Sequence, residues 1–132
     1  MLKNKILILI LVIIAASFSW FAFSGKDNEK PNFITREEIT SKDVVVIENE
    51  SGFEPQEITI KKGTRIIWLN KTQAYIWPAS NLHPTHEIYP DFDPQEPYEP
   101  NMAWAFEFKK AGEWGYHDHL KSNKRGRIIV ID

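Results

Sequence analysis

Hydrophobic and polar residues alternate with a period of two in the second half of the chain. Between Met102 and Phe108, large apolar side chains fill every second position, and two alanines and a glutamate lie between them. Successive side chains of a strand point to opposite faces, so this stretch predicts a strand with one buried face. Shorter apolar or β-branched runs bounded by turn residues predict further strands. They are Val44–Ile47, Glu57–Ile60, Thr64–Leu69, Glu113–His119 and Arg127–Ile131.

Short strands divided by turns predict an all-β fold, a β-sandwich. Apart from the first segment, no stretch of the chain has a helical period. The predicted domain covers residues 43–132, and about 90 residues with many aromatic side chains are enough to bury a core without disulfides. Trp77 and Trp104 are both predicted to be core residues.

The first 23 residues are predicted to be a membrane anchor. Lys3 and Lys5 precede an apolar run from Ile6 to Phe23. As a helix this run would be about 27 Å long, close to the hydrocarbon thickness of a bilayer. Basic residues beside a membrane helix stay in the cytoplasm, so the domain is expected on the other side of the membrane. The alternative is a cleaved signal peptide, which would leave a secreted or periplasmic domain.

Residues 24–42 are polar and charged, without periodicity, and are predicted to be a linker. After Phe23 the chain carries 14 basic and 18 acidic residues, a net charge of −4. This charge gives no general attraction for nucleic acid or for an anionic membrane surface. The chain has no cysteine, which excludes disulfides, thiolate metal sites and a cysteine-linked lipid anchor.

The candidate chemistry lies in the histidines. The chain has four, in two short-spaced pairs: His83, His86, His117 and His119. Strand alternation puts the second pair on one face and Trp114, Tyr116 and Asp118 on the other, which argues against Asp118 as a ligand. Pro84 favours a turn that brings the first pair to one side. Neutral imidazole binds Cu, Zn and Ni, so the pattern predicts a metal site made by all four histidines. The alternative is that they are hydrogen-bonding groups that hold a loop.

The first histidine pair belongs to a long segment, Pro78 to Pro100, which contains six prolines. Proline resists the interior of a sheet, so the segment is predicted to be a loop outside the ladders, ordered by its own aromatic residues. Its acids are predicted to form a solvated face; they are Glu87, Asp91, Asp93, Glu96 and Glu99. A small basic patch is predicted beside the site, able to pair with this loop or to dock an acidic partner. It consists of Lys121, Lys124, Arg125 and Arg127.

Several stretches together resemble the cupredoxins, the plastocyanin- and azurin-type blue copper proteins. They are Gly52-Phe53-Glu54-Pro55, Ile58-Thr59-Ile60, Trp68-Leu69-Asn70, Trp104 to Phe108 and the run from Gly112 to Ile131. The resemblance covers roughly residues 44–131 and implies a Greek-key β-sandwich that binds copper. The chain departs from the family where copper is bound, because a blue copper centre takes a Cys thiolate, two His and a weak axial ligand. His117 stands about where that Cys falls, and Ile76 near the first His.

What remains is similar to a cysteine-free cupredoxin variant with the motifs His-Pro-Thr-His and Tyr-His-Asp-His. The second motif also resembles a His-x-His copper-binding motif of multicopper oxidases. The expected function is therefore copper binding by a membrane-tethered, extracytoplasmic domain, with zinc as the alternative ion. Such a domain either handles copper for another envelope protein or transfers electrons. Two alternatives stay open, a metal-free interaction domain and a small copper-dependent oxidase. The chain contains no nucleophile elbow, P-loop or dinucleotide motif, so it is not expected to be an enzyme.

Overall fold

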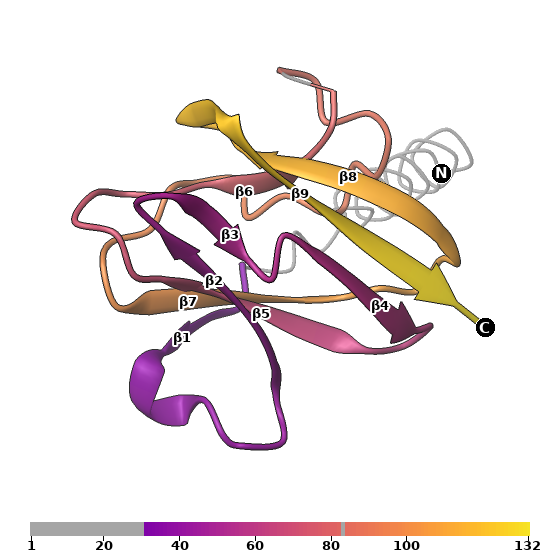
Figure 1. Cartoon of the computed structure of the whole chain (residues 1–132), viewed down its shortest axis with the longest axis horizontal. Coiled ribbons are helices and arrows are strands. Elements are labelled where there is room, and N and C mark those ends of the chain that lie inside the picture. Colours follow the sequence, from indigo (N-terminus) through magenta and orange to yellow (C-terminus); the bar gives the residue numbers. More distant parts are fainter. Residues whose placement is uncertain (1–30, 83) are drawn as a thin grey trace, which may run out of the picture. The chain divides into compact units, whose positions relative to one another are not determined.

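The computed structural model describes residues 31–82 and 84–132. This part of the chain forms two β-sheets that face each other (Figure 1). The first sheet has the strand order β1 (Phe33–Thr35), β7 (Met102–Glu107), β5 (Arg65–Asn70), β2 (Val44–Asn49) and β3 (Gly52–Glu54). The second has the order β4 (Glu57–Lys61), β9 (Lys121–Ile131), β8 (Gly112–Asp118) and β6 (Pro78–Ser80). A short 3-10 helix, η1 (Arg36–Glu38), follows β1.

Both sheets are mixed. Strand β2 runs parallel to β5, and β4 runs parallel to β9, while the other neighbouring strands are antiparallel. All six strands predicted from the sequence are present, with ends shifted by one or two residues except in β9, which begins six residues earlier than predicted. The period of two therefore locates the strands correctly.

Strand β1 belongs to the range predicted to be a linker, yet it pairs with β7, with Phe33 opposite Trp104. Strand β6 belongs to the segment that was predicted to lie outside the ladders, and it pairs with β8. This second prediction is corrected for residues 78–80. The reason is positional: Pro78 is the first residue of a strand at the sheet edge, where the missing N–H is tolerated.

The core fills the space between the two sheets and is mainly aromatic. Trp68 of β5 has no exposed surface and contacts four other rings of the core. The alternation predicted for residues 102–108 is confirmed, because Trp104 and Phe108 join this core while Ala103 and Ala105 belong to a separate cluster. Trp104 is thus a core residue as predicted.

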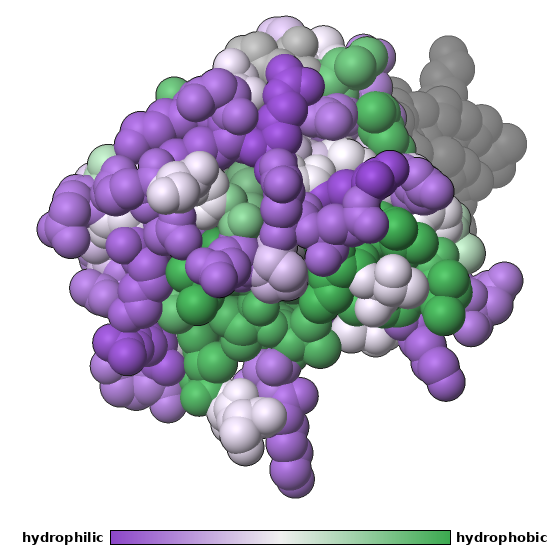
Figure 2. All heavy atoms as spheres, viewed as in Figure 1, coloured by the Kyte–Doolittle hydropathy of each residue, from purple (hydrophilic) through white to green (hydrophobic). Residues whose placement is uncertain are grey.

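The segment after β6 contributes to the same core. Phe92 has no exposed surface and stacks on Trp104, with 5.6 Å between ring centroids and 6° between planes. Tyr89 and Tyr98 are also almost completely buried. The prediction of an ordered segment held by its aromatic residues is confirmed. Seen from outside, the face in Figure 2 is largely hydrophilic, with a hydrophobic area in its lower half, where β2 and β5 lie.

The predicted membrane anchor and residues 24–30 of the predicted linker lie outside the described residues. Within residues 31–82 and 84–132, no helix has the length and apolar character needed to cross a membrane. Residues Pro31–Asp132 form one compact unit.

Candidate metal centre

Strand β8 places the second histidine pair on the side away from the core. Tyr116 is fully buried against Trp68 and Phe53 between the sheets. His117, the next residue, points to the opposite face, as strand alternation requires. His119 follows the end of the strand, and its backbone N–H donates a hydrogen bond to the carbonyl of Trp77 at 2.7 Å. The predicted division of faces is confirmed.

His86 reaches the same place from the segment after β6. Its backbone N–H donates a hydrogen bond to the carbonyl of Leu82, and Pro84 and Thr85 lie in a turn just before it. The buried hydroxyl of Ser80 lies 2.8 Å from the carbonyl oxygen of His86 and 2.9 Å from that of Tyr89. His86 has φ 54°, a left-handed conformation that is uncommon for a residue with a Cβ and that clusters at functional sites. The turn and Ser80 hold His86 in this conformation.

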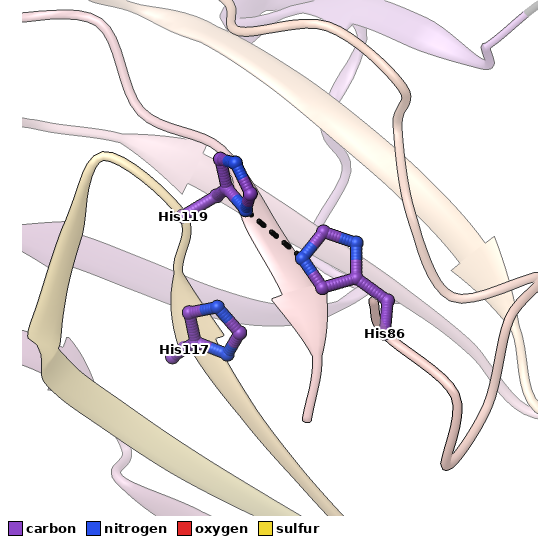
Figure 3. A group of neighbouring side chains, drawn as sticks. All are labelled: His86, His117 and His119. Carbon is purple, nitrogen blue, oxygen red and sulfur yellow. Dashed lines mark hydrogen bonds between the residues drawn. The ribbon is translucent and has the colours of Figure 1, made fainter. Parts of the chain in front are cut away.

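Three imidazole rings converge (Figure 3). One ring nitrogen each from His86, His117 and His119 lies within 4.8 Å of the others. The shortest separation is 3.0 Å, between Nε2 of His86 and Nδ1 of His119. Two imidazole nitrogens bound to one ion at about 2.0–2.1 Å, with an angle near 90–110°, lie about 2.9–3.4 Å apart. His86 and His119 therefore have the spacing of two ligands of one metal ion.

His86 is held from its other side by a carboxylate. Its Nδ1 lies 2.7 Å from Oδ2 of Asp93, and Oδ1 of Asp93 accepts hydrogen bonds from Nε1 of Trp77 at 2.7 Å and from the backbone N–H of Gln95 at 2.7 Å. Burial alone would raise the pKa of Asp93, but these hydrogen bonds together hold it below its ordinary value. Metal-binding histidines commonly donate their second N–H to such a carboxylate.

These contacts correct two predictions. Asp93 was expected on a solvated acidic face, but its carboxylate is largely buried against His86. Trp77 was expected in the core, but it is only partly buried, and its ring lies 4.6 Å from that of His119. Both residues were missed because the contacts that define them join residues 7 to 42 positions apart, which no local period reveals.

His117 has a partner in Asn81. Its Nδ1 lies 3.0 Å from Oδ1 of that side chain. The amide of Asn81 packs directly over Gly115 of β8, where a Cβ would lie only 2.6 Å from Nδ2 of Asn81. A glycine at residue 115 therefore leaves room for the group that contacts His117. Sequence reasoning missed Asn81, although its place two residues before the first histidine pair was an available signal.

His83 lies outside the described residues, so its membership of the site stays a prediction. Asp118 was not expected to be a ligand, and its side chain points toward the core, where it has no exposed surface. Its Oδ1 accepts hydrogen bonds from the backbone N–H groups of Trp77 and Leu120, both at 3.0 Å. Asp118 thus ties the start of β6 to the end of β8 beneath the three rings.

A second polar cluster lies on the inner side of β8. Nζ of Lys124 is 3.1 Å from Oε1 of Glu48 and 2.6 Å from the carbonyl oxygen of Asn49. Burial, and then the charge of nearby Asp118, raise the pKa of Glu48 to about 7. The side chains of Glu48 and Asp118 also make a hydrogen-bond contact with each other, which adds to the rise in the pKa of Glu48.

This cluster corrects the predicted basic patch. Lys124 is buried with Glu48, and Arg127 is paired with Glu57 and Glu113 across neighbouring strands. Two of the four bases are therefore occupied by partners within the chain. Only the lysine and the arginine at positions 121 and 125 remain as candidates for a surface patch.

Ile76, the residue that the resemblance places near a first histidine ligand, is buried at 1% exposure and pairs with Tyr98 in an isolated bridge. Its side chain has no ligand atom. In the structure as described, His86, His117 and His119 are the single group of three or more His, Asp or Glu side chains close enough to hold one ion.

Solved structures with the same fold exist, although no protein-family model and no curated protein matches the chain. One is a Cu(I) structure of an amicyanin variant, with a TM-score of 0.66 and 17% sequence identity, covering 78% of this chain and 95% of that one. An oxidised amicyanin variant gives a TM-score of 0.68 at 17% identity with the same coverage. A reduced variant gives 0.65 at 18% identity, covering 80% and 95%. At this identity the likeness shows the fold alone, and it confirms the predicted cupredoxin-type β-sandwich.

Proposed function

We propose that this protein binds one copper ion through His86, His117 and His119, with His83 as a fourth ligand. The observation that carries the proposal is the convergence of three imidazole nitrogens within 4.8 Å, two of them at the spacing of ligands that share an ion. Imidazole is a ligand for both copper and zinc. Copper is favoured because the amicyanins that share the fold include a Cu(I) structure, and zinc is the alternative ion.

The proposed role is copper handling for another protein of the cell envelope. Fast electron transfer at blue copper centres uses a thiolate ligand, and the chain has no cysteine. Electron transfer is therefore the weaker form of the proposal. The N-terminal anchor and the extracytoplasmic position are proposals from the sequence alone. Fractionation of cells that express the full chain tests the anchor, since an uncleaved anchor keeps the chain in the membrane fraction after a salt wash.

Metal analysis of the purified full-length chain tests the function. After loading with Cu(II) and removal of excess ion, we expect one copper per chain and a pale solution with only weak visible absorption. Thiolate-to-copper charge transfer cannot occur without cysteine. A chain that retains neither copper nor zinc would leave the metal-free interaction domain as the better interpretation. An intense blue colour would contradict the imidazole ligand set.

A further inference from the structure

The contact between Asp93 and His86 determines which ring nitrogen faces the other histidines. An ionised carboxylate only accepts hydrogen bonds, so the proton in the 2.7 Å contact belongs to Nδ1 of His86. A neutral imidazole has one N–H proton. The lone pair of His86 therefore lies on Nε2, the atom that is 3.0 Å from Nδ1 of His119.

Asp93 is itself fixed in place. Its Oδ1 accepts from the indole N–H of Trp77 and from the backbone N–H of Gln95, and both of these groups can only donate. The carboxylate is 18% exposed and the imidazole of His86 is 6% exposed, so water competes little with their contact. The ring of Trp77 also lies against His119. Asp93 thus orients His86 directly and also holds the indole of Trp77 in place beside His119.

We propose that Asp93 is a positioning residue of the metal site, which holds His86 as the Nδ1–H tautomer so that Nε2 is the ligand atom. This inference rests on the proposed metal-binding function, because it assigns the donor atom of one ligand. In the metal-free site, Asp93 is then the residue that keeps Nε2 of His86 without a proton. In the metal-free chain the Nε2 lone pair accepts a hydrogen bond from Nδ1–H of His119. A metal ion takes the place of that proton, and no proton has to move within the His86 ring.

The substitution Asp93→Asn separates this role from simple packing. The amide oxygen of Asn is expected to stay with the two donors, Trp77 and Gln95, because turning it away would lose two hydrogen bonds. The NH₂ group then faces Nδ1 of His86 and donates to it. His86 must accept at Nδ1 and carry its proton on Nε2, so the variant keeps the shape of the site and blocks the ligand atom.

Two measurements on the full-length protein test the proposal. Long-range ¹⁵N–¹H correlation spectra of the metal-free chain at about pH 8, where unperturbed imidazole is neutral, report the tautomer of each histidine. Titration with Zn(II), and with Cu(II) against a competing chelator, reports affinity. The matched control is Asp91→Asn, which removes the same charge two residues away. Asp91 is 77% exposed and its nearest charged partner is Lys110, at 3.9 Å.

We expect the Nδ1–H tautomer of His86 in the wild-type chain and in Asp91→Asn, and the Nε2–H tautomer in Asp93→Asn. The Asp93 variant should bind either ion about 10–100-fold more weakly, as is usual for the hydrogen-bond partner of a metal ligand, while the control should not change. An Nε2–H tautomer in the wild type overturns the proposal even if the variant fails to fold. Equal affinities of the Asp93 variant and the control overturn it as well.

Failure of the proposed function has a different signature. If the wild-type chain shows the Nδ1–H tautomer and binds neither Zn(II) nor Cu(II), then Asp93 orients His86 as inferred but the cluster is not a metal site. That result overturns the role of Asp93 in metal binding together with the function. If the wild type binds metal and its His86 is the Nε2–H tautomer, the function stands and the inference about Asp93 is wrong.

Discussion

Strand β8 separates two polar clusters that differ in the chemistry of their side chains. On its outer side, His86, His117 and His119 bring neutral donor nitrogens together, and His119 stays partly exposed. On its inner side, the carboxyl groups of Glu48 and Asp118 lie with the ammonium of Lys124. These three residues, all buried, are the inner charged cluster. The inner cluster already contains its cation, since Nζ of Lys124 lies on Glu48 and on the carbonyl of Asn49.

The difference shows how one strand serves binding and structure at consecutive positions. His117 and Asp118 are neighbours in sequence, yet alternation sends the first to the imidazole cluster and the second toward the core. Asp118 then supports the outer side from below through the backbone N–H groups of Trp77 and Leu120. Ligands on one face and their scaffold on the other should therefore respond differently to substitution.

The largest effect is expected for the imidazole cluster. His117→Ala should lower Cu(II) affinity by more than about 100-fold, since even the partners of ligands are usually worth 10–100-fold. Adding His86→Ala should then cost little, because the first substitution has already destroyed the shared geometry. Titration of the two single variants and the double variant measures the coupling. Losses that simply add, with two ions bound per wild-type chain, would mean that the two histidine pairs form separate sites.

The second prediction concerns stability without a change of ligands. Lys124→Met removes the ammonium that contacts Glu48 and the carbonyl of Asn49, and it should lower the free energy of unfolding by about 1–3 kcal/mol. The loss stays moderate because Glu48, whose pKa is about 7, takes up a proton and does not remain a buried charge. Lys121→Met on the same strand, at a partly exposed position, should cost no more than about 0.5 kcal/mol. Urea unfolding of the metal-free proteins checks both. If the Lys124 variant is as stable as the wild type, the inner charged cluster is not a structural element.

The third prediction is a dependence of stability on pH. Burial and Asp118 raise the pKa of Glu48 from 4.5 to about 7, so the folded state binds a proton that the unfolded state releases near pH 4.5. The resulting stabilisation is complete below about pH 4.5 and is lost as pH rises through about 7, a change of about 3 kcal/mol. Unfolding curves of wild type and Glu48→Gln between these pH values isolate it, because Gln has no such proton. A difference between the two proteins that is constant with pH would contradict the raised pKa.

The smallest effect is expected for Asp118→Asn. The amide oxygen still accepts from Trp77 and Leu120, and the new NH₂ group gives the carboxyl of Glu48 a donor. Metal affinity should therefore stay within about 3-fold of wild type, and stability should be equal or higher by up to about 1 kcal/mol. Asp118→Ala removes the acceptor and should lower both the metal affinity and the stability. A large loss of affinity in the Asn variant would indicate that Asp118 is itself a ligand.

The sequence correctly predicts which face of β8 each side chain occupies, but it predicts few of the contacts that these side chains make. A period of two is enough to place Tyr116 in the core and His117 outside it. This is a local property of the backbone. The aromatic residues of the long segment, such as Phe92, also point to their burial, because large apolar rings are rarely left in water.

What could not be predicted depends on contacts between distant residues. Glu48 and Lys124 are 76 positions apart, and each looks like an ordinary surface charge in its own segment. Trp77 and Asp93 acquire their roles only when β6 pairs with β8 and the following segment folds back over the strand. The Cys and the first His of the cupredoxin pattern are absent from this chain. The family pattern therefore gave no guide to the residues that contact the histidines.

X-ray absorption spectroscopy of the copper-loaded full-length chain is the sharpest test of the three-imidazole site, because it reports the atoms around the ion. We expect nitrogen ligands at about 2.0 Å with the outer-sphere scattering of at least three imidazoles, and no sulfur. The same spectrum should be unchanged in Lys124→Met, because that residue belongs to the inner cluster. A coordination sphere of carboxylate oxygens with one imidazole or none would contradict the claim that the three rings outside β8 form the metal site.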